Sequence, residues 1–264
     1  MKKLVVLSVI MLIFASITLL ATWDILFENS HPDKKEKNLN VWKPKEVKTE
    51  IDFLNGELNV SAQTLNKVYS GDYRYKKEDW KPEISYTEEQ GTGYLRIIST
   101  DDNEDKQYDS SNDNEWHINL NKDIRNDLNI RMGAGTGKFE LTGCNLKRFD
   151  FQMAAGEAKI NLRNTSVPEL RIKAIAGKAT VDLTGEWHND LHASITGGIG
   201  ELSFILPEAI GTRMEITGIL ANIYAPGFEK NGHIYTNSKF GNTKETMYIE
   251  IFGGIGEIDV TMED

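Results

Sequence analysis

The chain has 264 residues, a single cysteine and a net charge of −10 at neutral pH. One cysteine excludes an internal disulfide, so the burial of apolar side chains has to stabilise the fold. The acidic balance argues against nucleic-acid binding, which requires a basic surface.

The first 23 residues predict a membrane segment. Lys2 and Lys3 precede an uncharged stretch from Leu4 to Trp23, which is long enough to span a bilayer, and the basic flank favours a cytoplasmic N-terminus. A cleaved signal peptide is the alternative; Ala21 would suit the −1 position, but Leu19 fits the −3 position poorly. We therefore expect a single-pass anchor in the cell membrane with the bulk of the chain outside the cytoplasm. In the alternative, the chain is secreted after cleavage.

Residues 24–46 predict a charged linker. Lysines and acidic residues are interspersed here, and Pro32 and Pro44 interrupt regular structure. We expect a solvated spacer between the membrane and the folded part.

Residues 47–127 are β-rich but less regular than the chain that follows. Asn55-Gly56 is a typical turn dipeptide, and further strands are expected at residues 83–88, 94–99 and 116–120. We interpret this region as opening coils with an irregular cap, since the terminal units of a stacked repeat need an atypical outer face.

An acidic loop within this region is a weak candidate for calcium binding. Asp101, Asn103 and Asp105 alternate in the manner of an oxygen-rich calcium loop. The sixth position of that pattern holds Lys106, where a glycine is required. A solvated loop without a metal is therefore the expectation.

Residues 128–264 contain six copies of one pattern. The copies begin at Leu128, Phe149, Leu170, Leu191, Met214 and Met247, and the first four starts are 21 residues apart. Apolar residues recur at every second position within each copy, which is typical of strands with one buried face. Self-similarity at a fixed period of this size indicates a stacked-repeat architecture.

A small residue recurs at one phase of the copies, which predicts a structural corner. These residues are Gly135, Gly156, Gly177, Gly198, Ala221 and Gly254. A glycine at a constant phase marks a sharp backbone bend or a close approach of stacked coils. We expect an all-β fold, a single-stack parallel β-helix of ~21-residue coils, right-handed as parallel crossovers are, with an inserted loop at residues 226–244. An antiparallel β-sandwich or meander is the alternative.

Candidate chemical groups do not converge in the sequence. The glycines of 133–137 lack the flanking residues of a phosphate-binding loop, because Met132 and Phe139 occupy required positions. His188 and His192 are four residues apart but straddle a predicted turn, which gives no zinc site. Cys144 has no patterned partner and is interpreted as a packed thiol. We expect no cofactor.

Outward acidic residues leave a carbohydrate-active enzyme as an alternative hypothesis. Glu140, Asn161, Asp182 and Ser203 share one predicted column. Its two carboxylates are two coils apart, about 9–10 Å, which is loose for paired acid–base catalysis. We therefore expect no enzymatic activity.

The Gly-Gly-Ile-Gly-Glu runs at 197–201 and 253–257, together with the glycine cluster at 133–137, carry a family resemblance. The chain resembles the bacterial toast-rack and putative-adhesin β-strand repeat families, and the C-terminal domain of cell-wall-active antibiotic response proteins. The resemblance implies a cell-envelope or stress-associated setting. We expect a non-catalytic, adhesin-like module that presents strand faces and the 226–244 loop to an envelope protein, a cell-wall polymer or a neighbouring copy. The alternatives are a carbohydrate-active β-helix enzyme and a self-assembling structural protein.

Overall fold

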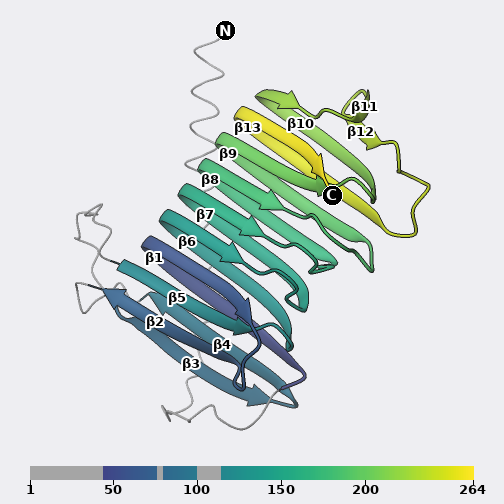
Figure 1. Ribbon diagram of the computed structural model, residues 1–264. Coiled ribbons are helices and arrows are strands. Elements are labelled where there is room, and N and C mark those ends of the chain that lie inside the picture. The colour runs from purple at the N-terminus through teal and green to yellow at the C-terminus, as the bar shows by residue number, and fades with distance from the viewer. Residues whose placement is uncertain (1–43, 76–79, 100–113) are drawn as a thin grey trace. The chain divides into compact units, whose positions relative to one another are not determined.

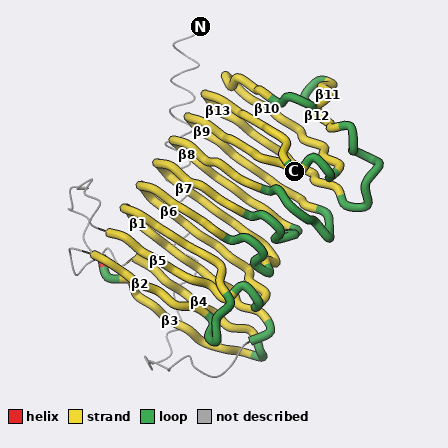
Figure 2. The backbone as a smooth tube through the Cα atoms, in the orientation of Figure 1, coloured by secondary structure: helices red, strands yellow, loops and turns green. Residues whose placement is uncertain are grey.

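The computed structural model describes residues 44–75, 80–99 and 114–264, and its elements are strands (Figures 1 and 2). They are β1 (Glu46–Gln63), β2 (Tyr69–Tyr75), β3 (Pro82–Glu89), β4 (Thr92–Ser99), β5 (Asn114–Asn121), β6 (Arg125–Glu140), β7 (Leu146–Asn161), β8 (Glu169–Asp182), β9 (Leu191–Pro207), β10 (Gly211–Tyr224), β11 (Phe228–Asn231), β12 (Ile234–Asn237) and β13 (Thr246–Glu263).

The membrane segment predicted over residues 1–23 lies outside the described residues, as does the linker up to residue 43. In the described ranges, no helix combines the length and the hydrophobicity that crossing a bilayer would require.

Seven long strands form the rungs of a solenoid-like ladder. They lie in the order β1-β6-β7-β8-β9-β13-β10, and each pairs in parallel with the next (Figure 1). The antiparallel meander is therefore wrong for these repeats. An eighth rung is interrupted, because β4 pairs in parallel with the first half of β1 and β5 pairs in parallel with its second half.

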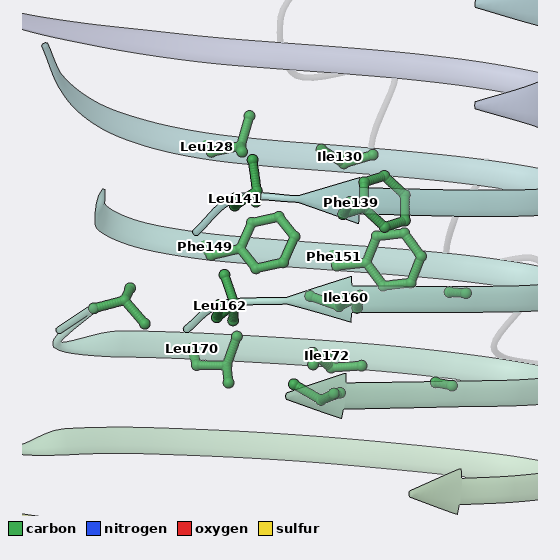
Figure 3. Packing of buried hydrophobic residues seen from close by; sticks show 14 of the residues in the cluster. Leu128, Ile130, Phe139, Leu141, Phe149, Phe151, Ile160, Leu162, Leu170 and Ile172 are labelled. Atoms are coloured by element: carbon green, nitrogen blue, oxygen red, sulfur yellow. The ribbon is translucent and has the colours of Figure 1, made fainter. Parts of the chain in front are cut away.

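Each rung bends into two arms that face each other across the core. In β6, residues Leu128 and Ile130 of the first arm are fully buried, as is Phe139 of the second arm. The ring of Phe139 packs edge-on against Phe151 of the next rung, with 4.9 Å between centroids (Figure 3). Burial of one face of both arms explains the period-two pattern of the sequence and supplies the main stabilising free energy.

A column of glycines forms the bend between the arms. We name it the corner column; it contains Gly56, Gly135, Gly156, Gly177, Gly200 and Gly256, all with φ between 112° and 139°. A side chain built at Gly156 would overlap the carbonyl oxygen of Gly135 in the rung before it, and the same overlap recurs at each later glycine of the column. The corner therefore requires glycine both for its φ and for the close approach of successive rungs.

The register corrects two of the predicted corner residues. Gly177 pairs with Gly200 and not with Gly198, and Gly200 pairs with Gly256 and not with Gly254. The spacing between β8 and β9 is therefore 23 residues, since Leu170 pairs with Ala193. A slip of two residues preserves the inward–outward alternation, so the sequence pattern cannot reveal it.

The two additional residues lie in the turn between β8 and β9. That turn buries Trp187, whose indole N–H donates to the carbonyl oxygen of Leu183 at 2.8 Å. Gly198 and Gly254 are also sterically restricted to glycine, because a Cβ at either position would overlap a carbonyl oxygen of the neighbouring rung. Ala221 occupies the corner position of β10, opposite Gly256.

The C-terminal strand does not lie at the end of the ladder. β13 is inserted between β9 and β10, so the fourth and fifth repeats of the sequence are not neighbours. The predicted inserted loop at 226–244 contains the hairpin β11–β12, and β12 pairs antiparallel with the first arm of β10. Buried Asn237 holds this cap: its side chain accepts from the backbone N–H of Thr212 and donates to the carbonyl oxygen of Ile210.

The opposite end of the ladder is capped on both arms. β3 pairs antiparallel with β4, and β2 pairs antiparallel with β5. The strands predicted at 83–88, 94–99 and 116–120 match β3, β4 and β5 within two residues. The expected boundary between 127 and 128 falls inside β6, because β1 and the interrupted rung continue the same ladder.

Candidate functional site

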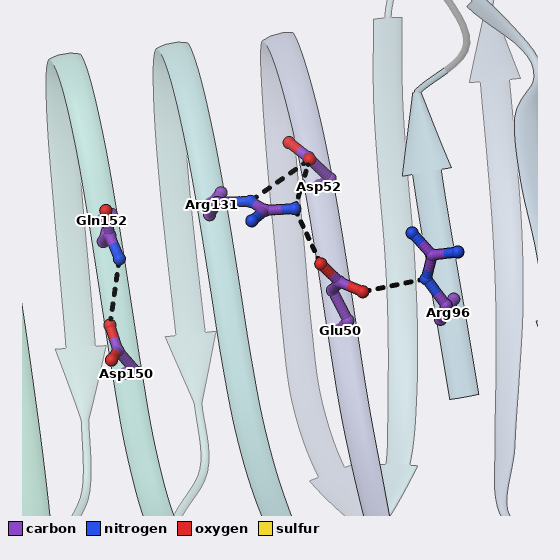
Figure 4. Close-up of polar contacts among 6 residues, drawn as sticks. All are labelled: Glu50, Asp52, Arg96, Arg131, Asp150 and Gln152. Carbon is purple, nitrogen blue, oxygen red and sulfur yellow. Dashed lines mark hydrogen bonds and ion pairs between the residues drawn. The ribbon is translucent and has the colours of Figure 1, made fainter. Parts of the chain in front are cut away.

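The outer face of the first arms carries a charge network near the β1 rung. Arg131 of β6 bridges Glu50 at 2.7 Å and Asp52 at 2.8 Å, and Arg96 of β4 contacts Glu50 from the other side at 2.9 Å (Figure 4). All four side chains are partly exposed, so each pair contributes little alone. The network joins three neighbouring rungs and is structural.

Glu140 and Asp182, the two carboxylates of the predicted column, are not direct neighbours. Glu140 and Asp182 remain in one column, with Asn161 between them donating to Glu140 at 2.9 Å. The shifted register moves Ser203 out of this column and places it opposite Thr180. The uncharged Asn161 therefore separates the two carboxylates, as the sequence predicted for this pair.

One further acid on this face is held in an ion pair. Glu201 contacts the ammonium group of Lys178 at 2.6 Å and accepts from the Ser203 hydroxyl at 2.9 Å. These two hydrogen bonds hold the pKa of Glu201 below its usual range. This carboxylate is therefore ionised at neutral pH and is not poised as a general acid.

Of the remaining sequence candidates, only those within the described residues can be placed in the fold. Asp101, Asn103 and Asp105 fall outside the described residues. Across the described ranges, no three His, Cys, Asp or Glu side chains are grouped to hold a metal ion. Cys144 is buried, and burial, together with the charge of Asp123, raises the pKa of its thiol to about 12, so the thiol is protonated at neutral pH.

A shallow hollow lies on the outer face of the first arms of β8, β9, β13 and β10. We name it the first-arm hollow; its outward side chains are Glu169, Arg171, His192, Ser194, Arg213, Tyr248 and Glu250. The rings of His192 and Tyr248 lie side by side on neighbouring rungs, 5.2 Å apart at their centroids and within 9° of parallel. Each ring therefore covers one face of the other, and the edges and outer faces of the pair remain accessible beside charged groups.

The register explains why the surface is depressed here. Ser194 lies between Arg171 and Glu250 in one row across three rungs. Rungs are about 4.8 Å apart, so a short side chain between two long ones leaves a gap that is bounded on one side by the two rings. The floor is formed by the strands themselves at Leu170, Ala193 and Ile249.

The hollow combines groups of both charges with the ring pair. It offers the guanidinium groups of Arg171 and Arg213 and the carboxylates of Glu169 and Glu250. Arg213 also contacts Glu215 at 3.5 Å, whereas Arg171 forms no ion pair within the described part of the chain. Aromatic rings pack against the apolar faces of sugar rings, and the charged groups beside them can donate and accept hydrogen bonds. The hollow therefore suits a polyhydroxylated ligand.

Sequence reasoning considered His192 only as a zinc ligand and did not identify the hollow. Tyr248 and Arg213 lie on opposite sides of the 226–244 insertion in the sequence. Tyr248 pairs with His192 and Arg213 pairs with Tyr248, because β13 is inserted between β9 and β10. In the sequence, Tyr248 is an aromatic residue at an outward position of a strand. Such a residue does not indicate a binding site unless the neighbouring strand and its register are known.

One solved structure is similar to most of the chain. It is described as a "putative cell adhesion protein" from Clostridium sporogenes ATCC 15579; it is 28% identical, covers 84% of this chain and 94% of its own, and superimposes with a TM-score of 0.66. A "putative adhesin" from Bacteroides fragilis NCTC 9343 is 12% identical over the same shares of the two chains, with a TM-score of 0.24. No curated protein matches the chain.

A family model described as the N-terminal domain of toast_rack, DUF2154, matches residues 27–168 and 148–205. Together these matches span more than half of the chain and include the interrupted rung, the rungs β1, β6, β7 and β8, and β9 up to residue 205. The chain therefore belongs to the toast_rack N-terminal domain family.

Proposed function

We propose that this protein is a non-catalytic, adhesin-like module of the bacterial cell envelope and that the first-arm hollow binds a glycan of a cell-wall or surface polymer. The parallel ring pair of His192 and Tyr248, set among two guanidinium groups and two carboxylates, is the observation that carries the proposal. The similarity to a protein described as a putative cell adhesion protein supports it.

The side chains of the hollow project from paired strands, so the backbone does not have to become ordered when a ligand binds. The ring pair contacts the apolar face of a sugar, while Arg171 donates to its hydroxyl groups and Glu250 accepts from them. An open hollow buries only part of a ligand, so one site binds weakly and adhesion depends on several copies acting together.

Replacing Tyr248 by alanine is expected to weaken binding to purified wall polysaccharide about fivefold, since an aromatic contact of this kind contributes on the order of 1 kcal/mol. Tyr248 is 36% exposed and is not part of the core, so the thermal midpoint should stay near that of the unchanged protein. Binding is measured by affinity electrophoresis, and folding by circular dichroism.

Phe252→Ala is the matched control. Phe252 is an outward aromatic on the same strand, 46% exposed, and it does not line the hollow. Equal binding by the unchanged protein and Tyr248→Ala, or an equal loss in both variants, would remove the hollow as the site. New reducing or unsaturated ends in the polysaccharide would instead favour the carbohydrate-active enzyme.

We further propose that the rungs wind as a single-stack parallel β-helix and that residues 1–23 anchor it to the cell membrane. The parallel register of successive rungs supports the winding, and the uncharged stretch from Leu4 to Trp23 supports the anchor. The full chain should remain with the membrane after a high-salt wash and keep its first residues on N-terminal sequencing. A soluble product that begins after Ala21 would show a cleaved signal peptide.

A further inference from the structure

Two opposite charges flank the gap in the first-arm hollow. Arg171 of β8 and Glu250 of β13 lie on either side of Ser194 in one row across three rungs. Both side chains are exposed, and neither forms an ion pair with a residue of the described ranges. Neither charge therefore stabilises the fold through a partner of its own.

Elsewhere on the same outer face, opposite charges on neighbouring rungs pair directly. Arg131 of β6 contacts Asp52, its register partner on β1, at 2.8 Å (Figure 4). Two long side chains easily close the distance of about 4.8 Å between neighbouring rungs. In the hollow, the rung of Ser194 separates Arg171 from Glu250 by about 9.6 Å, which is two rung spacings. The hollow thus contains a positive and a negative charge that do not meet.

This separation sets the size of a ligand that bridges both charges. Side chains of a strand stand roughly perpendicular to the sheet, so the charged heads of Arg171 and Glu250 are about as far apart as their Cα atoms, about 9.6 Å. A charge-assisted hydrogen bond at each end takes up about 2.8 Å. About 4 Å then remains between the anion and the cation of the ligand, which places both groups on one sugar unit and not on two successive units.

The neighbouring rungs preserve the polarity of the gap. Glu215 of β10 is the register partner of Glu250 on the side away from the gap, so a second carboxylate adds to the attraction for a cation there. Arg213 contacts Glu215 at 3.5 Å and forms no ion pair with Glu250 within the described chain. At the other end, Asp150 is the register partner of Arg171, and no ion pair joins the two within the same ranges.

We propose that the glycan bound in the first-arm hollow contains an acidic amino sugar, whose carboxylate contacts Arg171 and whose ammonium group contacts Glu250. This proposal rests on the proposed function and specifies the sugar. The ring pair of His192 and Tyr248 borders the gap and contacts the sugar ring. The hollow has a volume of about 380 Å³, at the lower end of the range for ligand sites, which suits a single sugar unit.

Four sugars with the same ring test the proposal on the full-length chain in a neutral detergent. Muramic acid carries an amine and a carboxylate, N-acetylmuramic acid keeps only the charge of the carboxylate, glucosamine keeps only that of the amine, and glucose has neither. At neutral pH, muramic acid should bind at least about fivefold more tightly than each of the others, because hydrogen bonds between charged groups are the stronger ones. Titrations followed by saturation-transfer NMR measure the dissociation constants.

Two variants assign the two charges. Glu250→Gln should lower the affinity for muramic acid to about that for N-acetylmuramic acid and leave the affinity for N-acetylmuramic acid unchanged. Arg171→Gln should lower it to about that for glucosamine and leave the affinity for glucosamine unchanged. Lys173→Gln on β8 and Glu257→Gln on β13 are the matched controls, because these charged residues of the same strands do not line the hollow. Neither control should change a dissociation constant.

The outcomes separate this proposal from the proposed function. Equal binding of muramic acid and N-acetylmuramic acid, equal binding of muramic acid and glucosamine, or an equal loss in Arg171→Gln and Lys173→Gln would overturn the proposal. If all four sugars bind equally and Tyr248→Ala weakens each of them, the hollow remains a glycan site and only the requirement for charge is wrong. If neither the wall polysaccharide nor any of the sugars binds, both proposals are wrong.

Discussion

Replacing Gly156 by alanine is expected to lower the free energy of unfolding by on the order of 3–5 kcal/mol. Gly156 has a φ of 130°, beyond the left-handed region that other residues can enter, and a Cβ there would overlap the carbonyl oxygen of Gly135. The rung cannot relax outward without breaking the ladder on both sides, since β7 pairs with β6 and β8 along most of its length. Urea unfolding followed by circular dichroism measures the change.

Gly143→Ala provides the control for backbone strain alone. Gly143 has a φ of 64°, and a Cβ there would meet no atom within 4 Å. Gly143→Ala should therefore lower the free energy of unfolding only by the cost of a left-handed alanine, about 1–2 kcal/mol. An equal decrease in the free energy of unfolding in the two variants would show that the close approach of rungs at the corner column does not contribute to stability.

Ending the chain at Glu245, which removes β13, should abolish the ordered pairing of β10 with the ladder. β13 pairs with β9 over Leu191–Pro207 and with β10 over Gly211–Tyr224, and no direct pairing of β9 with β10 replaces it. Residues 208–245 should then lose their hydrogen-exchange protection, whereas β1, β6, β7 and β8 should keep theirs, because their partners remain. Mass-spectrometric exchange resolves the two groups.

A peptide of residues 245–264 added to the truncated chain tests whether the strand alone is responsible. It should restore the protection of β10, since its backbone groups and apolar side chains fill the gap. The same peptide with Ile251→Asp and Ile258→Asp should fail, because both isoleucines are buried. Protected β10 amides in the truncated chain without any peptide would contradict the strand order.

The strands and their bends could be predicted from the sequence because both follow from local rules. Alternation of apolar residues identified one buried face, and the recurring glycines marked the corner between arms. Gly135, Gly156 and Gly177 were placed in register because their spacing is constant. Gly198 and Gly254 were displaced by two residues, because a shift of two leaves every side chain on the same face.

The order of strands could not be predicted in the same way. The sixth copy shares its Gly-Gly-Ile-Gly-Glu run with the fourth, but a shared run does not by itself place two strands side by side. The capping role of the 226–244 insertion depends on Asn237 meeting Thr212 and Ile210, which are distant in sequence. The first-arm hollow requires both the shifted register and the inserted strand, so its members became visible only in the structure.

The corner column also sets the unit by which this ladder can change in evolution. Gly135, Gly156 and Gly177 follow one another at intervals of 21 residues, and each rung between them meets its neighbours in the same alignment. Loss or duplication of one whole interval leaves every remaining glycine opposite another glycine, whereas a partial change would misalign the rest. The ladder can therefore become longer or shorter by whole rungs. Such a change alters the distance between the hollow and the β1 rung and leaves the residues of both unchanged.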